Sequence, residues 1–289
     1  MTQQKKPQSP MQRVKQRRRI RAVIQLIFFI LAPSVYTAAF GGIKEIASDI
    51  GASDPIAMSS FVTALIAVCI YTILFGRFFC GYACAFGSLG DAVHALAQMI
   101  QKKVKKKLPT LPERVVFILQ KVKYLILAAI IVLCAAGVYG NLSGWSPWDV
   151  FSMLTSLRVP EAKYWLGAVL LVLILIGMAV QERFFCQFLC PMGAVFALLP
   201  HIGMYRRDRN NCLPRCSACE KNCPVHVKTD ASDPRSGECI CCGKCSDICP
   251  KRNISYIKYG TDGNTWLPVI VRSVILFALF FALSMVRFL

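Results

Sequence analysis

The amino-acid sequence predicts a polytopic α-helical membrane protein with one polar insert. Of its 289 residues, 55% are hydrophobic and 17% are charged, and the mean hydropathy is +0.50. Soluble domains contain about 25% charged residues and keep their apolar runs short. An α-helix needs about 20 mostly apolar residues to cross the hydrocarbon core of a bilayer. Four core segments meet this requirement: 22–40, 57–76, 122–140 and 164–181.

A fifth apolar segment, 266–286, is predicted to be a C-terminal membrane helix, although Pro268 and Arg272 interrupt its first turns. The first span also has features of a signal peptide, because a basic stretch precedes its apolar run. We expect this span to be retained. Its apolar run is longer than that of a typical signal peptide, and it forms a pair with the second span in the repeat described below.

The basic residues predict how the chain is oriented in the membrane. The net charge is +19, and Lys and Arg are concentrated in residues 1–21 and in the connection 77–121, whereas the connections 41–56 and 141–163 hold three. An excess of Lys and Arg marks the cytoplasmic side. We therefore expect a multi-pass protein of the plasma (inner) membrane with a basic cytoplasmic N-terminus, and no nucleic-acid binding. The lysine run 102–107 is most simply a topology signal, the alternative being a docking face for an acidic partner or anionic lipid.

Residues 206–262 form a polar insert with a dense cysteine pattern. The stretch 212–224 reads CLPRCSACEKNCP and the stretch 239–250 reads CICCGKCSDICP. The second stretch has the cysteine spacing of bacterial [4Fe–4S] ferredoxins, in which the cysteine before the proline binds the neighbouring cluster. We expect this insert to be an α+β two-cluster ferredoxin-like domain on the cytoplasmic side. The segment 253–259, NISYIKY, alternates as a short strand does.

The spacing assigns the cysteines of the insert to two clusters. One cluster is expected to be bound by Cys223, Cys239, Cys242 and Cys245. The other is expected to be bound by Cys212, Cys216, Cys219 and Cys249. Cys212 departs from the pattern, because three residues separate it from Cys216 where two are usual, and Cys241 is predicted to be a packed or spare thiol. A pair of zinc sites is the alternative, but zinc sites do not require the Cys-Pro ending twice.

The membrane part, residues 22–205, contains an internal repeat. The chain reads RFFCGYAC at 77–84 and RFFCQFLC at 183–190, and a glycine follows each motif at the same distance. Each motif follows the second span of a pair, so the repeat unit is a helix hairpin. Repeated halves of membrane proteins pack about a pseudo-two-fold axis with the functional site between them. Both motifs are predicted on the same side, so we expect this axis along the membrane normal.

The repeated motif predicts a site made of four cysteines. Residues four apart lie on one face of a helix, so Cys80 and Cys84 would present two sulfurs in one direction, and so would Cys186 and Cys190. If these two faces meet, they form a four-thiolate site at the membrane surface, which would be a further cluster, a metal site or a thiol redox site. The alternative is a set of packed cysteines, which are common in apolar interiors.

Other polar and sulfur-containing residues have simpler explanations. Arg77 and Arg183 are expected to extend to the cytoplasmic interface, the alternative being stabilisation of thiolates. Cys69 and Cys134 lie alone in spans and are predicted to be packing residues.

The three histidines are His94, His201 and His226. His94 and His201 occupy nearly equivalent repeat positions, where they could bind a haem or quinone or take up protons, but interfacial packing is the simpler interpretation. No haem is predicted, because no pair of histidines lies on facing spans. Trp145, Trp148 and Asp149 are candidates for a quinone pocket, with an aromatic belt as the commoner explanation.

Taken together, these motifs resemble the NapH/MauN-type family of membrane ferredoxins, and the resemblance covers about residues 20–260. The stretch 186–191, CQFLCP, matches the family motif fully, whereas Ala85 stands where the family has proline. The span 263–289 is not part of the nitrate-reductase type. Similar membrane modules occur in the nitrous-oxide reductase regulator and in oxidase-assembly polyferredoxins. The resemblance implies quinol oxidation by the membrane part, with electrons leaving through iron–sulfur centres.

The sequence therefore predicts a membrane-bound iron–sulfur electron-transfer protein. It would exchange electrons between the quinol/quinone pool and a redox partner protein such as a reductase, cytochrome or flavoprotein, as a quinol dehydrogenase component. One alternative is a metal-reducing assembly factor for a respiratory metalloenzyme, and another is a membrane redox sensor. The direction of electron flow does not follow from the sequence, because cluster potentials span a very wide range.

Overall fold

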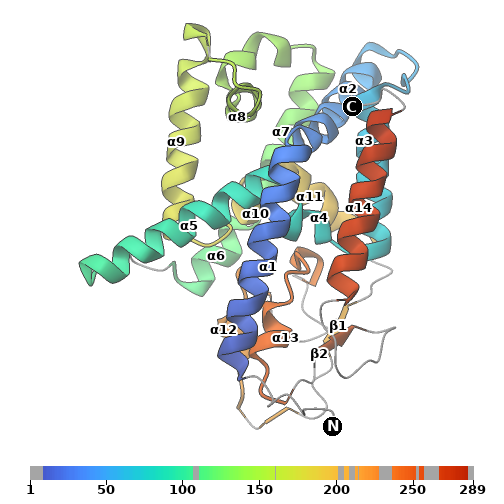
Figure 1. Ribbon diagram of the computed structural model, residues 1–289. Helices are drawn as coiled ribbons and strands as arrows, with labels where there is room; N and C mark the ends of the chain where they lie inside the picture. Colours follow the sequence, from blue (N-terminus) through green and yellow to red (C-terminus); the bar gives the residue numbers. More distant parts are fainter. Residues whose placement is uncertain are drawn as a thin grey trace.

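The computed structural model describes residues 9–106, 111–159, 161–200, 205–207, 212–213, 215–227, 236–251, 254–256 and 267–285. The apolar helices form a bundle, and the cysteine-rich segment (residues 212–250) packs at one end of it, beside the N-terminal half of α1 (Figure 1). His201 lies outside the described residues.

The first predicted span is not one straight helix. Helix α1 (Pro10–Leu31) begins at a capping box, in which Ser9 Oγ accepts from the backbone N–H of Gln12 and Gln12 Oε1 accepts from that of Ser9. Helix α2 (Val35–Ala52) follows at an angle of 62°. Proline at position 33 explains the bend, because proline lacks a backbone N–H and restricts the residue before it. The prediction of a single span over 22–40 is therefore wrong, and α2 occupies much of the predicted 41–56 connection.

Three helical stretches are long and apolar enough to cross a membrane among the described residues, and the bent α1–α2 pair is a fourth when counted as one span. These three are Glu113–Ala135, Ala162–Val180 and Pro268–Met285. They contain α7 (Val122–Ala135), α9 (Trp165–Val180) and most of α14 (Leu267–Met285). Helix α3 (Ser60–Phe75) replaces the predicted span 57–76, but its 16 residues fall short of the about 20 that a full crossing needs. The chain is thus a helical membrane protein, as predicted.

The connections between these helices are themselves helical. After α3 come α4 (Phe78–Tyr82), α5 (Ala85–Val104) and α6 (Glu113–Leu119). After α9 come α10 (Phe184–Phe188) and α11 (Pro191–Leu198). The segment between α7 and α9 contains η1 (Tyr139–Trp145), α8 (Pro147–Thr155) and η2 (Ala162–Tyr164). The two repeats are therefore α3–α4–α5 and α9–α10–α11, and α5 packs against α9.

The cysteine-rich segment is flanked by a short ribbon. Strand β1 (Tyr205–Arg207) pairs antiparallel with β2 (Ile254–Tyr256), with Arg206 opposite Ser255. Between the strands are α12 (Ala218–Lys221), η3 (Ser236–Glu238) and α13 (Lys244–Ile248). The strand expected within 253–259 is present over 254–256, and the remainder of that stretch lies outside the described residues.

Basic residues of α1 hold the cysteine-rich segment. Arg13, Arg17 and Arg21 are spaced by four and so share one face of the helix. The guanidinium of Arg17 forms a buried ion pair with Asp247 of α13, and Arg13 Nη2 donates to the carbonyl of Cys249 at 3.1 Å. The N-terminal basic stretch is therefore more than a topology signal, because it fastens α1 to the cysteine-rich segment.

The C-terminal helix α14 packs on the first repeat. Phe28 of α1 makes edge contacts with Phe277 and Phe280, and Phe79 of the first motif also contacts Phe280. Arg272 is buried, with its guanidinium 5.9 Å from the centre of the Phe78 ring. These contacts bring α14 beside the first RFFC motif.

Candidate redox site at the repeat interface

Each Cys-x3-Cys motif crosses a break between two helices. Cys80 lies in α4 and Cys186 in α10, whereas Cys84 and Cys190 precede the first residues of α5 and α11 in extended backbone. The expectation that each pair shares one continuous helix is therefore wrong. The break places the second cysteine of each motif at the N-cap of the next helix, and Cys190 Sγ accepts from the N–H of Gly193 at 3.2 Å.

The structure brings the four motif cysteines together and buries them. Each of the four side chains is 5–7% exposed. They are close enough that a negative charge on Cys80, Cys186 or Cys190 would raise the pKa of Cys84. Burial, together with the neighbouring thiols, raises the pKa of Cys84, and burial raises that of Cys190 to about 12. Thiols in this environment stay protonated unless cations compensate their charge. The donor set therefore fits a bound iron–sulfur group, which supplies that positive charge.

Among the residues that the structure describes, no three His, Cys, Asp or Glu side chains are placed to hold one metal ion.

The motif arginines are buried, so the prediction that they extend to the membrane interface is wrong. Arg183 is 1% exposed; its Nη1 donates to the carbonyl of Cys80 at 2.6 Å and its Nη2 donates to that of Gly81 at 3.1 Å. Its Nη2 also lies 2.6 Å from Asp91 Oδ2. Arg77, equally buried, donates to Glu238 Oε2 at 2.9 Å. A carboxylate partner allows each guanidinium to remain charged in the interior.

Each motif arginine packs against a glycine of the other repeat. Arg183 of the second repeat lies against Gly87 of the first, where an added Cβ would overlap its Nη1. Arg77 of the first repeat lies against Gly193 of the second, where a Cβ would be 3.2 Å from its Nη2. The glycine after each motif therefore leaves room for the close approach of an arginine from the other half, with less room at Gly87 than at Gly193. This reciprocity is what a two-fold relation between the repeats produces.

Replacing Gly87 with alanine is expected to destabilise the protein by about 1–3 kcal/mol, the usual cost of adding a methyl group to a filled interior. The added Cβ would overlap Arg183 Nη1 and lie 3.0 Å from the carbonyl oxygen of Cys80. Thermal unfolding in detergent measures the effect. Gly140→Ala is the control, because nothing lies within 4 Å of its added Cβ. Equal unfolding temperatures for the two variants would contradict this packing.

Glu238 joins the first repeat, α7 and the cysteine-rich segment. It accepts from Arg77, from Lys123 and from the hydroxyl of Tyr124 at 3.0 Å. Burial disfavours its charge, but Arg77 and Lys123 outweigh this and lower the pKa of Glu238. Lys123, in the first turn of α7, is fully buried. Glu238 therefore carries a charge that two buried cations require.

Sequence reasoning did not identify Asp91 or Glu238. One signal for Asp91 was available: the 77–121 connection is rich in Lys and Arg and contains only two acidic residues, Asp91 and Glu113. Asp91 Oδ2 lies 2.6 Å from Arg21 and from Gln25 as well as from Arg183. Glu238 directly precedes Cys239, the first cysteine of the second ferredoxin motif, and no pattern in the sequence distinguishes its carboxylate.

Each RFFC motif contacts one turn of the cysteine-rich segment. Gly81 lies directly against the carbonyl of Ile240, and Tyr82 donates its hydroxyl to the carbonyl of Cys242 at 3.2 Å. In the second motif, Gln187 Nε2 donates to the carbonyl of Pro224 at 2.7 Å. Both RFFC motifs are thus in direct contact with the cysteine-rich segment.

A small cavity lies between these turns. Its lining includes Cys223, Cys239, Cys242 and Cys245, the four residues that the spacing assigned to one cluster. Cys241 also borders it, with its Sγ 3.9 Å from the carbonyl of Cys239. Of the other four predicted ligands, Cys249 is buried, Cys216 and Cys219 are half-buried and Cys212 is exposed. Helix α12, which holds Cys219, packs against α13, which Cys249 follows.

The remaining candidates occupy ordinary packing positions. Cys134 is buried and Cys69 half-buried. Trp148 packs on the Phe40 ring at 5.3 Å, and Asp149 forms an ion pair with Lys44 at 3.8 Å. Trp145 is largely exposed, and His226 Nδ1 lies 3.3 Å from Gln187 Oε1.

Fold and site together define a helical membrane protein with buried, clustered cysteines. A family model described as a 4Fe-4S binding domain matches residues 57–107 and 164–207, one stretch in each repeat. No solved structure matches the chain.

The chain is 30% identical over 243 residues to protein MJ0749 of Methanocaldococcus jannaschii, an alignment that covers 82% of this chain and 86% of the relative. It is 27% identical over 210 residues to the ferredoxin-type protein NapH of Haemophilus influenzae, covering 67% and 66%. It is 27% identical over 194 residues to the putative electron transport protein YccM of Escherichia coli, covering 64% and 52%. The chain belongs to the NapH/MauN-type family of ferredoxin-type membrane proteins.

Proposed function

We propose that this protein exchanges electrons between the membrane quinol/quinone pool and a redox partner protein. The observation that carries the proposal is the direct contact between the RFFC motifs, which contain one group of cysteines, and the cysteine-rich segment, which contains the other. Four buried thiols lie at the repeat interface, and the cysteine-lined cavity of the cysteine-rich segment is reached from them through Gly81 and Tyr82. Two cysteine groups joined through neighbouring residues would let electrons pass from the membrane part to a surface-bound partner.

Three iron–sulfur centres would occupy these groups. The repeat interface would hold one cluster on Cys80, Cys84, Cys186 and Cys190. The cysteine-rich segment would hold two [4Fe–4S] clusters with the ligand sets that the spacing assigned. When bound, such clusters accept and release single electrons. The matched stretches 57–107 and 164–207 support the first centre, because they contain all four motif cysteines and none from the cysteine-rich segment.

The residues around the thiols have defined tasks in this proposal. Arg77 and Arg183 place two buried positive charges beside the thiolates, with Arg183 Nη1 4.0 Å from Cys186 Sγ. Positive charge favours the thiolate form and, for a bound cluster, the reduced state. Glu238 and Asp91 neutralise the far side of each guanidinium and hold it in place.

The proposed site faces the cytoplasm from the plasma membrane. Lys and Arg are concentrated in residues 1–21 and 77–121, which favours a cytoplasmic location for both. Arg13 and Arg17 contact residues of the cysteine-rich segment, so this segment lies on the same side as the N-terminus. The partner protein would therefore be met in the cytoplasm.

Mixing a quinol with the protein tests the proposal. The protein would be purified anaerobically with its clusters oxidised and placed in lipid nanodiscs. Addition of a short-chain quinol is expected to bleach the visible iron–sulfur absorption, and the matching quinone should restore it after reduction by dithionite. Bleaching by dithionite with no response to any quinol or quinone would contradict the proposal.

A further inference from the structure

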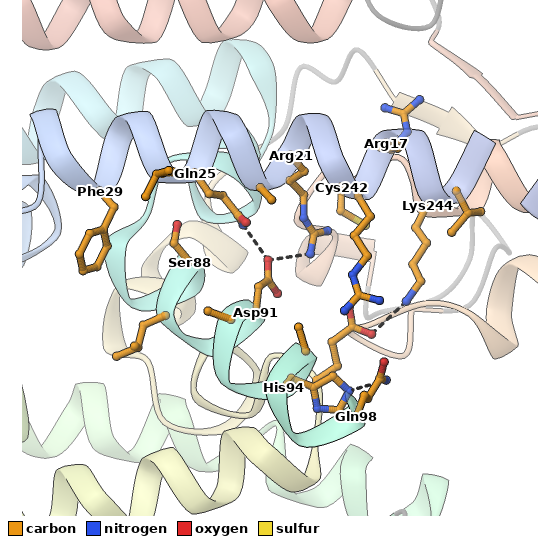
Figure 2. A pocket seen from close by; sticks show the side chains of 18 of the residues that line it. Arg17, Arg21, Gln25, Phe29, Ser88, Asp91, His94, Gln98, Cys242 and Lys244 are labelled. Carbon is orange, nitrogen blue, oxygen red and sulfur yellow. Dashed lines mark hydrogen bonds and ion pairs between the residues drawn. The ribbon is translucent and has the colours of Figure 1, made fainter. Parts of the chain in front are cut away.

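A cavity of about 490 Å³ lies between α1 and α5, and Cys242 is the one proposed cluster ligand among its lining residues. In Figure 2, Phe29 and Ser88 are at one end of it, and Cys242 and Lys244 are at the other. Its size lies within the range of about 300–1,000 Å³ that small-molecule sites occupy. Its lining changes from apolar residues, such as Leu26, Phe29 and Leu89, to charged ones. A lining of this kind suits a molecule with a polar ring and an apolar tail.

We propose that this cavity binds the quinol head group, with Asp91 and His94 as its polar contacts. This inference rests on the proposed function. It differs from the location suggested by the sequence, which pointed to Trp145, Trp148 and Asp149.

Asp91 presents an unused acceptor in this cavity. Arg21, Gln25 and Arg183 all approach its Oδ2, each at 2.6 Å. Its Oδ1 is buried and has no hydrogen-bond partner within the part of the chain that the structure describes. A buried acceptor left unpaired costs about 1–3 kcal/mol, and a ligand hydroxyl would remove that cost. Burial disfavours the charge, but Arg183 and Arg21 outweigh it and lower the pKa of Asp91, so Asp91 accepts a hydrogen bond and not a proton.

His94 is arranged to accept a proton at Nε2. Its Nδ1 lies 3.3 Å from the carbonyl oxygen of Met178 and 3.2 Å from that of Ala179. Carbonyl oxygens only accept, so Nδ1 carries hydrogen and Nε2 is the acceptor of the neutral ring, 3.0 Å from Gln98 Nε2. Both carbonyls belong to the last turn of α9, and the C-terminus of a helix favours a positive charge. The ring can therefore gain a proton at Nε2 and keep its Nδ1 bonds.

The cavity adjoins both cysteine groups. Asp91 and His94 are three residues apart and share one face of α5. Cys242 lines this cavity and also the small cysteine-lined cavity. On the other side, Arg183 contacts both Asp91 and the carbonyl of Cys80. A quinol held here would lie beside two of the proposed electron acceptors.

The chemistry balances with the proposed clusters as the oxidant. The quinol loses two electrons and two protons as its two O–H bonds break and two C=O bonds form. The electrons leave one at a time to oxidised [4Fe–4S] clusters. His94 Nε2 takes the hydroxyl protons in turn and passes each to water at the charged end of the cavity.

Binding of a quinol analogue tests the site without relying on turnover. Fluorescence quenching of 2-heptyl-4-hydroxyquinoline N-oxide would be titrated with the full-length, cluster-loaded protein in nanodiscs. Ala92→Trp places a large ring in the cavity, and Leu96→Trp places the same ring on an exposed position of α5 that does not line it. We expect Ala92→Trp to weaken binding about tenfold or more, which is at least 1.4 kcal/mol, and Leu96→Trp to match the wild type.

His94→Gln separates proton transfer from packing. It is expected to slow cluster reduction by quinol about tenfold or more and to leave the iron content and reduction by dithionite unchanged. Equal analogue binding by the wild type and Ala92→Trp would overturn this site while leaving the proposed function intact. The site would also be overturned if Ala92→Trp lost a bound anionic phospholipid that the wild type keeps, as measured by mass spectrometry, while analogue binding was unchanged. Failure of the wild type itself to respond to quinol would instead refute the proposed function.

Discussion

Replacing Glu238 with glutamine is expected to lower the stability of the protein by about 3–5 kcal/mol, the usual cost of removing one partner from a buried ion pair. Glu238 is the carboxylate between Arg77 and Lys123, both of which are at most 1% exposed. Glutamine keeps the size of the side chain but removes its charge. Two buried cations would then repel each other with no anion between them. Thermal unfolding in detergent, followed by circular dichroism, would measure the loss.

Glu161→Gln provides the matched control for this prediction. Glu161 forms an ion pair with Lys163 at 3.0 Å, but both side chains are more than half exposed. Exposed pairs contribute little to stability because water screens them. We therefore expect Glu161→Gln to unfold like the wild type. If Glu238→Gln also unfolded like the wild type, the buried network around Arg77 would not stabilise the fold as described.

Replacing Cys242 with serine is expected to remove about four irons per chain, because a [4Fe–4S] cluster depends on its thiolate ligands. Cys242 lines the small cavity with Cys223, Cys239 and Cys245. The packing of the turn that contacts Gly81 should be lost as well, because the cluster would be the main support of that turn. Iron and acid-labile sulfide per chain, on anaerobically purified protein, measure the effect.

The neighbouring residue supplies the control for this prediction. Cys241 is also a buried cysteine, but the motif spacing leaves it without a cluster. Its Sγ lies against Gly76, where an added Cβ would be 2.8 Å away. Cys241→Ser is therefore expected to keep its iron. If Cys241→Ser lost four irons and Cys242→Ser kept them, the ligand assignment would have to be exchanged.

The local features of the chain were predictable because they depend on short stretches. The apolar runs identified the helices that now form α7, α9 and α14, and the duplicated RFFC motif indicated the repeat. Bacterial ferredoxin spacing selected the four cysteines that share the small cavity. Each apolar run, each copy of the RFFC motif and each ferredoxin motif is a short stretch, so no knowledge of the packing was needed.

The charge network was not predictable, because its partners are far apart in the sequence. Arg183 pairs with Asp91 across 92 residues, and Arg77 pairs with Glu238 across 161. An arginine at the end of an apolar run usually extends to the interface, and only a carboxylate brought there by the fold reverses that preference. The break between Cys80 and Cys84 was missed for a related reason. Spacing of four fits a helix, and the first motif has Ala85 where the second has Pro191 to mark a new helix start.

The iron content of the wild type and of a variant with all four motif cysteines replaced by serine tests the central claim most directly. The account predicts about twelve irons per chain in the wild type, because three clusters of four are proposed, and about eight in the variant. Acid-labile sulfide should fall in the same proportion. About eight irons in both proteins would contradict the account, since Cys80, Cys84, Cys186 and Cys190 would then hold no cluster at the repeat interface.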